Sequence, residues 1–270
     1  MSDVTDQPRV APGGLFDLSG KVAVITGSSR GIGRAIAEHL AAHGAKVTIS
    51  SRKAGPCEEV AAAINARSPG HAIAVPANIS SKEDLQRLMD ETRAAFGKID
   101  VLVCNAATNP HYGSQLEITD DAFSKILANN IIANNWMVQM VAPEMRARRN
   151  GSIIIVSSIG GLKGSEVIGA YCISKAADMQ LARNLARELG PDNIRVNCIA
   201  PGLVKTDFAR ALWDNPEGEQ RQAFATPLRR LGEPDDVAAI AAFLLAPDAG
   251  WMTGQIIGVD GGRSTLRPRG

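Results

Sequence analysis

The chain has 270 residues, and 45% of them are hydrophobic, which suffices for a full core and excludes a disordered chain. The 29 Lys and Arg against 28 Asp and Glu leave a net charge of +1, too little for the basic face that non-specific nucleic-acid binding needs. The four cysteines form no CxxC pair, the four histidines are scattered, and no apolar run approaches the roughly 18 residues of a membrane span, so we expect no metal site and no membrane partner.

Short apolar runs rich in β-branched residues alternate with Ala-rich helical stretches along the chain. Strands are predicted at 22–26, 46–50, 71–77, 101–105, 152–158, 194–201 and 255–260, and helices at 31–43, 81–96, 120–148, 171–189 and 234–246. The runs are nearly continuous in apolar residues, as in a parallel sheet that helices cover on both faces. We therefore predict an α/β fold, a single doubly wound Rossmann domain with a seven-stranded parallel sheet over 18–263.

Both ends of the chain look like tails. Residues 1–17 are polar, rich in Pro and Gly, and lack the apolar core of a signal peptide. We expect a loose N-terminal tail over 1–17, a C-terminal tail over 264–270, and a cytoplasmic protein.

The stretch TGSSRGIG, residues 26–33, follows the first predicted strand and opens the first helix. Gly27 allows a tight turn, while Gly31 and Gly33 let the backbone approach a pyrophosphate that the helix N-terminus attracts. No Gly-Lys-Ser/Thr ending is present, which disfavours a P-loop nucleotide hydrolase. A glycine-rich turn without a ligand is the alternative, and the strand before and helix after argue against it. The loop therefore predicts a dinucleotide site at the carboxyl ends of the strands.

The end of the second strand bears on the choice of dinucleotide. An NAD enzyme usually places an acid there, on the ribose 2′-OH, whereas this chain has Ser51, Arg52 and Lys53. We expect Arg30 to face the same region, and guanidinium groups without a carboxylate suit a 2′-phosphate. Ordinary solvated charges are the alternative interpretation. We favour NADP(H) over NAD(H).

Several motifs in the same order resemble the short-chain dehydrogenase/reductase family, over roughly residues 18–263. They are TGSSRGIG, CNAA (104–107), YCISK (171–175), NCIAPG (197–202) and GQIIGVDGG (254–262). Within that family the chain is most similar to the NADP-dependent carbonyl (retinal) reductase branch. Four positions depart from the family pattern: Asn78 and Ile79 stand where the family usually has Asp-Val, and Cys104 and Ala107 where it has Asn and Gly.

The resemblance implies the coenzyme contacts, residue by residue. They come from the glycine loop, the ends of the second to fourth strands, the catalytic helix, and the segment after the sixth strand that orients the nicotinamide. The residues are Gly27, Ser29, Arg30, Gly31, Ile32, Gly33, Ser51, Arg52, Asn78, Ile79, Asn105, Ala106, Tyr171, Lys175, Pro201, Gly202, Val204 and Thr206.

Tyr171 and Lys175 stand four residues apart, so on a helix they share one face. A nearby cation favours the phenolate, and the spacing thus predicts that Lys175 lowers the pKa of Tyr171 toward the working pH. A surface Tyr beside a surface Lys is the alternative that spacing alone favours. The resemblance implies instead that Tyr171 exchanges the proton of a carbonyl substrate and that Lys175 also anchors the nicotinamide ribose.

The fifth predicted strand ends in two serines, Ser157 and Ser158, which strand alternation places on opposite faces. The family's serine precedes its tyrosine by thirteen residues, which selects Ser158 as the hydrogen-bond donor to the substrate oxygen. The resemblance also implies that Asn130, in an otherwise apolar helix, holds a water that links the lysine to solvent.

The substrate is predicted only as a class. Phe208, Leu212 and Trp213 recur at helical spacing after the nicotinamide segment, which suggests an apolar lid and a hydrophobic ketone or aldehyde as small-molecule partner. One alternative is a 3-oxoacyl-[acyl-carrier-protein] reductase, whose acidic carrier would dock on basic residues such as 146–149. Another is a non-catalytic dinucleotide sensor. The family resemblance further implies a homotetramer.

Overall fold

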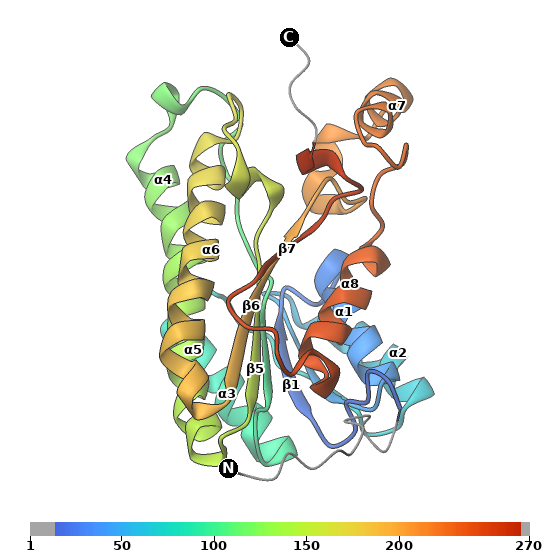
Figure 1. Cartoon of the computed structure of the whole chain (residues 1–270), viewed down its shortest axis with the longest axis vertical. Coiled ribbons are helices and arrows are strands. Elements are labelled where there is room, and N and C mark those ends of the chain that lie inside the picture. Colours follow the sequence, from blue (N-terminus) through green and yellow to red (C-terminus); the bar gives the residue numbers. More distant parts are fainter. Residues whose placement is uncertain (1–13, 266–270) are drawn as a thin grey trace, which may run out of the picture.

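The computed structural model describes residues 14–265 and contains a seven-stranded, fully parallel sheet (Figure 1). The strands lie in the order β3-β2-β1-β4-β5-β6-β7. Their bounds are β1 Val22–Thr26, β2 Lys46–Ser50, β3 Ala72–Ala74, β4 Val101–Cys104, β5 Gly151–Val156, β6 Ile194–Pro201 and β7 Ile256–Val259. This architecture confirms the predicted doubly wound sheet. Residues 1–13 and 266–270 of the predicted tails lie outside the described residues.

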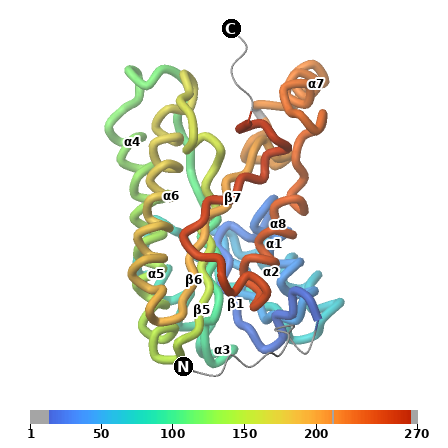
Figure 2. Tube along the Cα trace, in the orientation of Figure 1, coloured from blue at the N-terminus to red at the C-terminus, as the bar shows by residue number. Residues whose placement is uncertain are grey.

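Helices cover both faces of the sheet, α3, α4, α5 and α6 on one face and α1, α2 and α8 on the other (Figures 1 and 2). Their bounds are α1 Gly31–Ala42, α2 Ala54–Arg67, α3 Lys82–Phe96, α4 Asp120–Leu127, α5 Ala133–Arg148, α6 Gly169–Leu189, α7 Pro216–Phe224 and α8 Pro234–Leu245. Each layer has its own apolar core, because the strands alternate side chains to opposite faces. Among the described residues, none of the helices has the length and hydropathy needed to cross a bilayer.

The predicted long helix at 120–148 is interrupted. A π-helical segment, Ala128–Ile132, separates α4 from α5 and contains Asn129 and Asn130. Asn side chains compete for backbone hydrogen bonds and disfavour a regular helix interior, which fits the break at this point. Such π-helical turns are frequent at functional sites.

Two other differences from the predicted elements are a shorter third strand and two additional helices. Strand β3 covers three residues of the predicted 71–77, although the N–H groups of Val75 and Ala77 still donate to the carbonyl oxygens of Ile49 and Ser51. Helices α2 and α7 are not predicted by the sequence pattern. In α2 only Cys57, Val60, Ala61 and Ile64 are buried, so the helix carries a weak apolar stripe beside Gly55 and Pro56.

The topology positions the site. From β1 the chain continues to β2 and β3 on one side, and then crosses to β4 on the other side of β1. The connections leaving β1 and β4 therefore diverge, and a crevice opens at the carboxyl ends of these two strands.

Candidate active site

The glycine loop lies at this crevice, directly after β1. Gly27 and Gly31 adopt φ values of +67° and +55°, a backbone region that favours glycine. Helix α1 then begins without a side-chain cap and without an acidic residue in its first turn. Its first N–H groups are therefore open to an anion, and the helix dipole adds partial positive charge.

Asn105, after β4, fastens the glycine loop to the sheet. Its amide nitrogen donates to the carbonyl oxygens of Thr26 at 2.8 Å and Gly27 at 3.3 Å, and its backbone N–H donates to the Thr26 hydroxyl at 3.2 Å. A Cβ on Gly33 would lie 2.4 Å from the Gly27 carbonyl oxygen and 2.5 Å from the Asn105 amide nitrogen. The close packing therefore needs glycine at position 33, and the loop fits a pyrophosphate cradle.

The two arginines predicted to bind the coenzyme, Arg52 and Arg30, differ in whether they form an ion pair within the protein. Arg52 and Lys53, after β2, are exposed and form no ion pair within residues 14–265. Arg30 does not point to the same region as predicted: its guanidinium pairs with Asp207, beyond β6, at 3.3 Å. Within residues 14–265, Arg52 and Lys53 therefore present positive charge without an acidic partner just after the carboxyl end of β2.

The other predicted coenzyme residues line the same edge of the sheet. Ser51 places its hydroxyl 3.1 Å from the Cys57 sulfur, and Asn78 is an exposed residue that receives a hydrogen bond from the Ser80 N–H. Thr206 lies against the glycine loop, because a Cβ on Gly31 would be 3.1 Å from its methyl group. Ser29, Ile32, Ile79, Ala106 and Gly202 are partly buried, and Pro201 and Val204 are buried.

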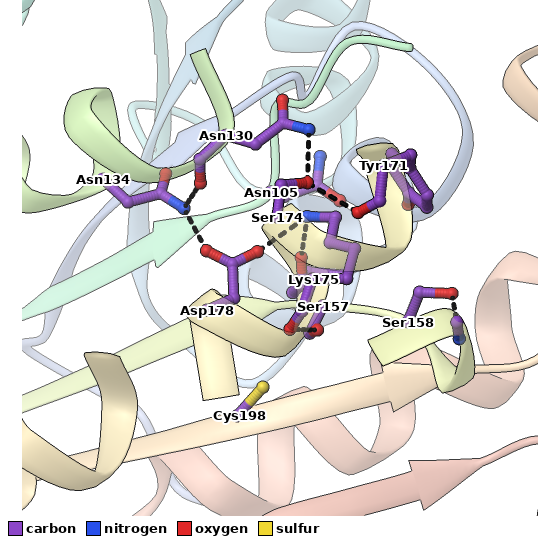
Figure 3. Close-up of polar contacts among 12 residues, drawn as sticks. Asn105, Asn130, Asn134, Ser157, Ser158, Tyr171, Ser174, Lys175, Asp178 and Cys198 are labelled. Carbon is purple, nitrogen blue, oxygen red and sulfur yellow. Dashed lines mark hydrogen bonds and ion pairs between the residues drawn. The ribbon is translucent and has the colours of Figure 1, made fainter. Parts of the chain in front are cut away.

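Tyr171 and Lys175 share a face of the first turns of α6, as their spacing predicts (Figure 3). The Lys175 ammonium lies 5.6 Å from the centroid of the Tyr171 ring. Lys175 is only 2% exposed, whereas Tyr171 is half-buried. The pair is thus part of the interior edge of the crevice and is not a surface pair.

The Lys175 ammonium has two acceptors in the protein. It donates to the Val156 carbonyl oxygen at the end of β5 and to the Asp178 carboxylate, each at 2.9 Å. Burial is the largest single influence and lowers the pKa of Lys175, but the charge and hydrogen bond of Asp178, together with Tyr171 and Cys198, raise it by more, so the net pKa is raised. The ammonium therefore stays charged although it is buried.

The net shift in the pKa of Tyr171 is upward, whereas the sequence spacing predicts a lowered pKa. Burial raises the pKa of the Tyr171 phenol, the Lys175 ammonium opposes this rise, and the Asp178 carboxylate adds to it. The i, i+4 spacing indicates the effect of the ammonium on the pKa of Tyr171, but it contains neither the burial of the phenol nor the Asp178 carboxylate.

The two serines after β5 face opposite ways. Ser157 is buried and donates to the Lys175 carbonyl oxygen in α6 at 2.7 Å. Ser158 is partly exposed, and its hydroxyl accepts the Gly160 N–H at 3.0 Å, so it caps the short helical turn Ile159–Leu162. The hydroxyl hydrogen of Ser158 remains available to a substrate oxygen, and Ser157 serves to attach α6 to the sheet.

Asn130 is fully buried, and its side chain is used by the protein. Its amide oxygen accepts the Thr108 N–H at 2.8 Å, and its amide nitrogen donates to the Thr108 carbonyl and the Ser174 hydroxyl at 3.0 Å. No direct hydrogen bond joins Asn130 to Lys175 within the described chain. Within the protein, a hydrogen-bonded path runs from the Asn130 carbonyl oxygen through Asn134 and Asp178 to Lys175. A water held by Asn130 stays a prediction.

Asp178, Asn134 and Thr108 are site residues that the sequence argument missed. A signal for Asp178 was present, since an acidic residue three positions after Lys175 falls on the same helical face in an apolar helix. Asn134 is one of four asparagines within residues 129–135, and the sequence gives no sign that it joins the site beside Asn130. Thr108 carries no local pattern, because only the tertiary structure brings it to Asn130.

The predicted lid is partly confirmed in place. The Phe208 ring lies 5.9 Å from the Tyr171 ring, between centroids, at an interplanar angle of 43°. Leu212 is exposed, whereas the Trp213 indole nitrogen is buried without a hydrogen-bond partner. Within residues 14–265 no cluster of His, Cys, Asp or Glu has the arrangement of a metal site.

Comparison with known proteins gives a consistent result. A family model described as enoyl-(acyl carrier protein) reductase matches residues 27–264. The chain is 42% identical over 260 residues to dehydrogenase/reductase SDR family member 4 of Homo sapiens, covering 94% of this chain and 92% of that protein.

Solved structures share the fold. A 7α-hydroxysteroid dehydrogenase complexed with NADH and 7-oxo glycochenodeoxycholic acid is 38% identical, with a TM-score of 0.86 over 92% of this chain and 95% of that chain. The RhlG/NADP active-site complex of Pseudomonas aeruginosa is 34% identical, with a TM-score of 0.85 over 92% and 98%. The chain is therefore an oxidoreductase that belongs to the short-chain dehydrogenase/reductase family.

Proposed function

We propose that the protein reduces the carbonyl group of an apolar ketone or aldehyde, with NADP(H) as coenzyme and Tyr171 as general acid. The observation that carries the proposal is the half-buried Tyr171 phenol, flanked on one side by the buried Lys175 ammonium and on the other by the Phe208 ring. A proton donor beside a fixed cation and an apolar wall suits a substrate with a carbonyl group on a hydrophobic body.

The coenzyme would be held by the glycine loop, Asn105, Arg52 and the segment 201–206. When bound, it supplies a hydride to the carbonyl carbon of the substrate. Tyr171 gives its hydroxyl proton to the carbonyl oxygen, so the product is the alcohol. The hydroxyl of Ser158 donates a hydrogen bond to the same oxygen and holds it in place. Lys175 stabilises the phenolate that remains on Tyr171.

The charge distribution favours NADP(H) over NAD(H). Arg52 and Lys53 form no ion pair in the described chain, and no carboxylate stands at position 51 to accept a ribose hydroxyl. Guanidinium binds a phosphate through paired hydrogen bonds. One similar structure contains NADH and another contains NADP, so the support for NADP(H) comes from this local chemistry.

Reduction of an acyl group on a carrier protein is disfavoured by the surface. The basic run 146–149 is neutralised within the chain: Arg146 pairs with Glu188 and Asp192, and Arg149 with Asp192. Arg148 pairs with Glu144 and reaches Asp100. An acidic carrier would have to compete with these carboxylates.

The test is NADPH oxidation with a panel of apolar ketones, aldehydes and quinones and a 3-oxoacyl thioester. We expect turnover with a compact apolar ketone or aldehyde and a lower kcat/KM for the thioester. Preference for the thioester, or NADPH binding without oxidation by any carbonyl, would contradict the proposal.

A further inference from the structure

Asp178 is a charged side chain that the proposed mechanism does not use. It is fully buried on α6, about one turn beyond Lys175 and two turns beyond Tyr171, and its carboxylate lies 2.9 Å from the Lys175 ammonium (Figure 3). A buried ion pair contributes little to net stability compared with apolar residues of similar volume. Stability therefore does not explain why Asp178 is buried beside the proposed acid Tyr171, which points to an effect on the site.

Burial raises the pKa of Asp178, and the Lys175 ammonium and the hydrogen bonds from Lys175 and Asn134 oppose this rise. Because both oxygens of Asp178 accept hydrogen bonds, the geometry favours the carboxylate. One carboxylate oxygen accepts from Lys175, and the other accepts from the Asn134 amide nitrogen at 3.0 Å. The same nitrogen donates to the Asn130 carbonyl at 2.6 Å, so both of its neighbours are acceptors and the amide orientation is fixed. With its nitrogen placed toward these two acceptors, the side-chain oxygen of Asn134 is buried without a hydrogen-bond partner.

The remaining titratable groups near the pair are neutral. Cys104 on β4 and Cys198 on β6 are buried thiols, and burial raises the pKa of both, that of Cys198 to about 12. On α6 itself, burial raises the pKa of the Tyr171 phenol and of the Cys172 thiol, so both are protonated at neutral pH. Asn130 and Asn134 carry no charge. The field at Tyr171 therefore comes mainly from one ammonium and one carboxylate of opposite sign.

We propose that Asp178 is a positioning residue of the proposed site: through its pairing with Lys175 it offsets the ammonium's field at Tyr171 and holds Tyr171 as the protonated phenol that carbonyl reduction uses. This inference rests on the proposed function. The ammonium is fixed toward Val156 and Asp178 in a single geometry, and its charge is shared with a carboxylate one hydrogen bond away. Asn134 completes the arrangement by fixing the carboxylate.

The consequence is a bias in pH dependence. Carbonyl reduction needs the phenol as proton donor, whereas alcohol oxidation needs the phenolate as acceptor. Because Asp178 disfavours a second negative charge nearby, reduction persists to higher pH than it would with a neutral residue at 178. Alcohol oxidation then sets in only at more alkaline pH.

The chain allows a direct test because it has only two tyrosines. In a Tyr112→Phe protein, the phenolate absorbance in the near ultraviolet reports Tyr171 alone, without turnover. We expect a midpoint above the ordinary tyrosine pKa of about 10 in the coenzyme-free protein. A midpoint below this value would mean that the ammonium acts on Tyr171 unopposed, and would overturn the inference.

The second arm compares Asp178→Asn with Asp178→Glu in the same background. Loss of the carboxylate lowers the Tyr171 midpoint, by about one pH unit, whereas Asp178→Glu keeps it near the parent value. An Asp178→Asn midpoint equal to or above the parent's contradicts the inference. Near-ultraviolet circular dichroism checks the fold, and Asp178→Ser, which leaves room for a water beside the ammonium, replaces Asp178→Asn if that variant does not fold.

The kinetic counterpart separates an electrostatic role from a structural one. In Asp178→Asn the alkaline limb of kcat/KM for carbonyl reduction moves to lower pH, while a structural defect lowers kcat/KM at every pH and leaves the limb in place. If the tyrosine titrates as expected but no carbonyl is reduced, the proposed function fails and the electrostatic assignment stands.

Discussion

Arg52 stands at the carboxyl end of β2, exposed and without an acidic partner in the described part of the chain. If it grips the 2′-phosphate of NADPH, Arg52→Ala should lower kcat/KM with NADPH and leave kcat/KM with NADH nearly unchanged. Hydrogen bonds to charged groups contribute about 1.5–3 kcal/mol, which corresponds to a loss of roughly ten- to hundredfold.

A matched control is Arg67→Ala, which removes the same charge from the far end of α2, where Arg67 lies 3.6 Å from Glu38. This variant should keep the parent's coenzyme preference. Equal losses with NADPH and NADH in Arg52→Ala would show that Arg52 does not read the phosphate.

The sequence predicts the positions of the proposed catalytic residues better than it predicts their pKa values. Tyr171, Lys175 and Ser158 follow from local spacing and from the family motif, and the structure places them around one crevice edge. The sign of the Tyr171 pKa shift did not follow, because it depends on burial and on Asp178. Burial is a tertiary property that the i, i+4 spacing does not contain.

At the scale of elements, the glycine loop and α1 act as one unit with the end of β4. Gly33→Ala brings a methyl group within 2.4 Å of the Gly27 carbonyl oxygen and 2.5 Å of the Asn105 amide nitrogen. The backbone must shift, so we expect weaker NADPH binding and a loss of about 1–3 kcal/mol in the free energy of unfolding. Calorimetric titration and thermal unfolding measure the two effects.

Helix α2 offers the control, since a Cβ on Gly55 would meet no atom within 4 Å. Gly55→Ala should leave NADPH affinity unchanged and stabilise the protein slightly, because alanine favours helix. Unchanged NADPH affinity in Gly33→Ala would argue against the loop as the pyrophosphate cradle.

The π-helical segment between α4 and α5 is an element that sequence periodicity does not reveal. The run 120–148 reads as one helix, and the break depends on the bonds of Asn129 and Asn130 to Thr108, which lies after β4. Helix α2 is also not revealed by the sequence. Much of this helix faces solvent, so the helical repeat of apolar residues is weak.

For the whole molecule, the sheet was predictable because each strand is a nearly continuous apolar run, and such runs need helices on both faces. The crevice follows from strand order, which places the ends of β1 and β4 where the chain reverses its direction across the sheet. The polar chain from Lys175 through Asp178 and Asn134 to Asn130 joins α6, α5 and the π-helical segment, and only the assembled fold brings these residues together.

The central claim is that the Tyr171 hydroxyl donates the proton in carbonyl reduction. The most direct measurement is the rate of NADPH oxidation by Tyr171→Phe with the best carbonyl of the panel, next to NADPH affinity measured by fluorescence. We expect kcat to fall by about 10²–10⁴-fold while NADPH still binds, because a positioned proton donor contributes an effect of this size. A Tyr171→Phe protein that reduces the carbonyl as fast as the parent would contradict the account.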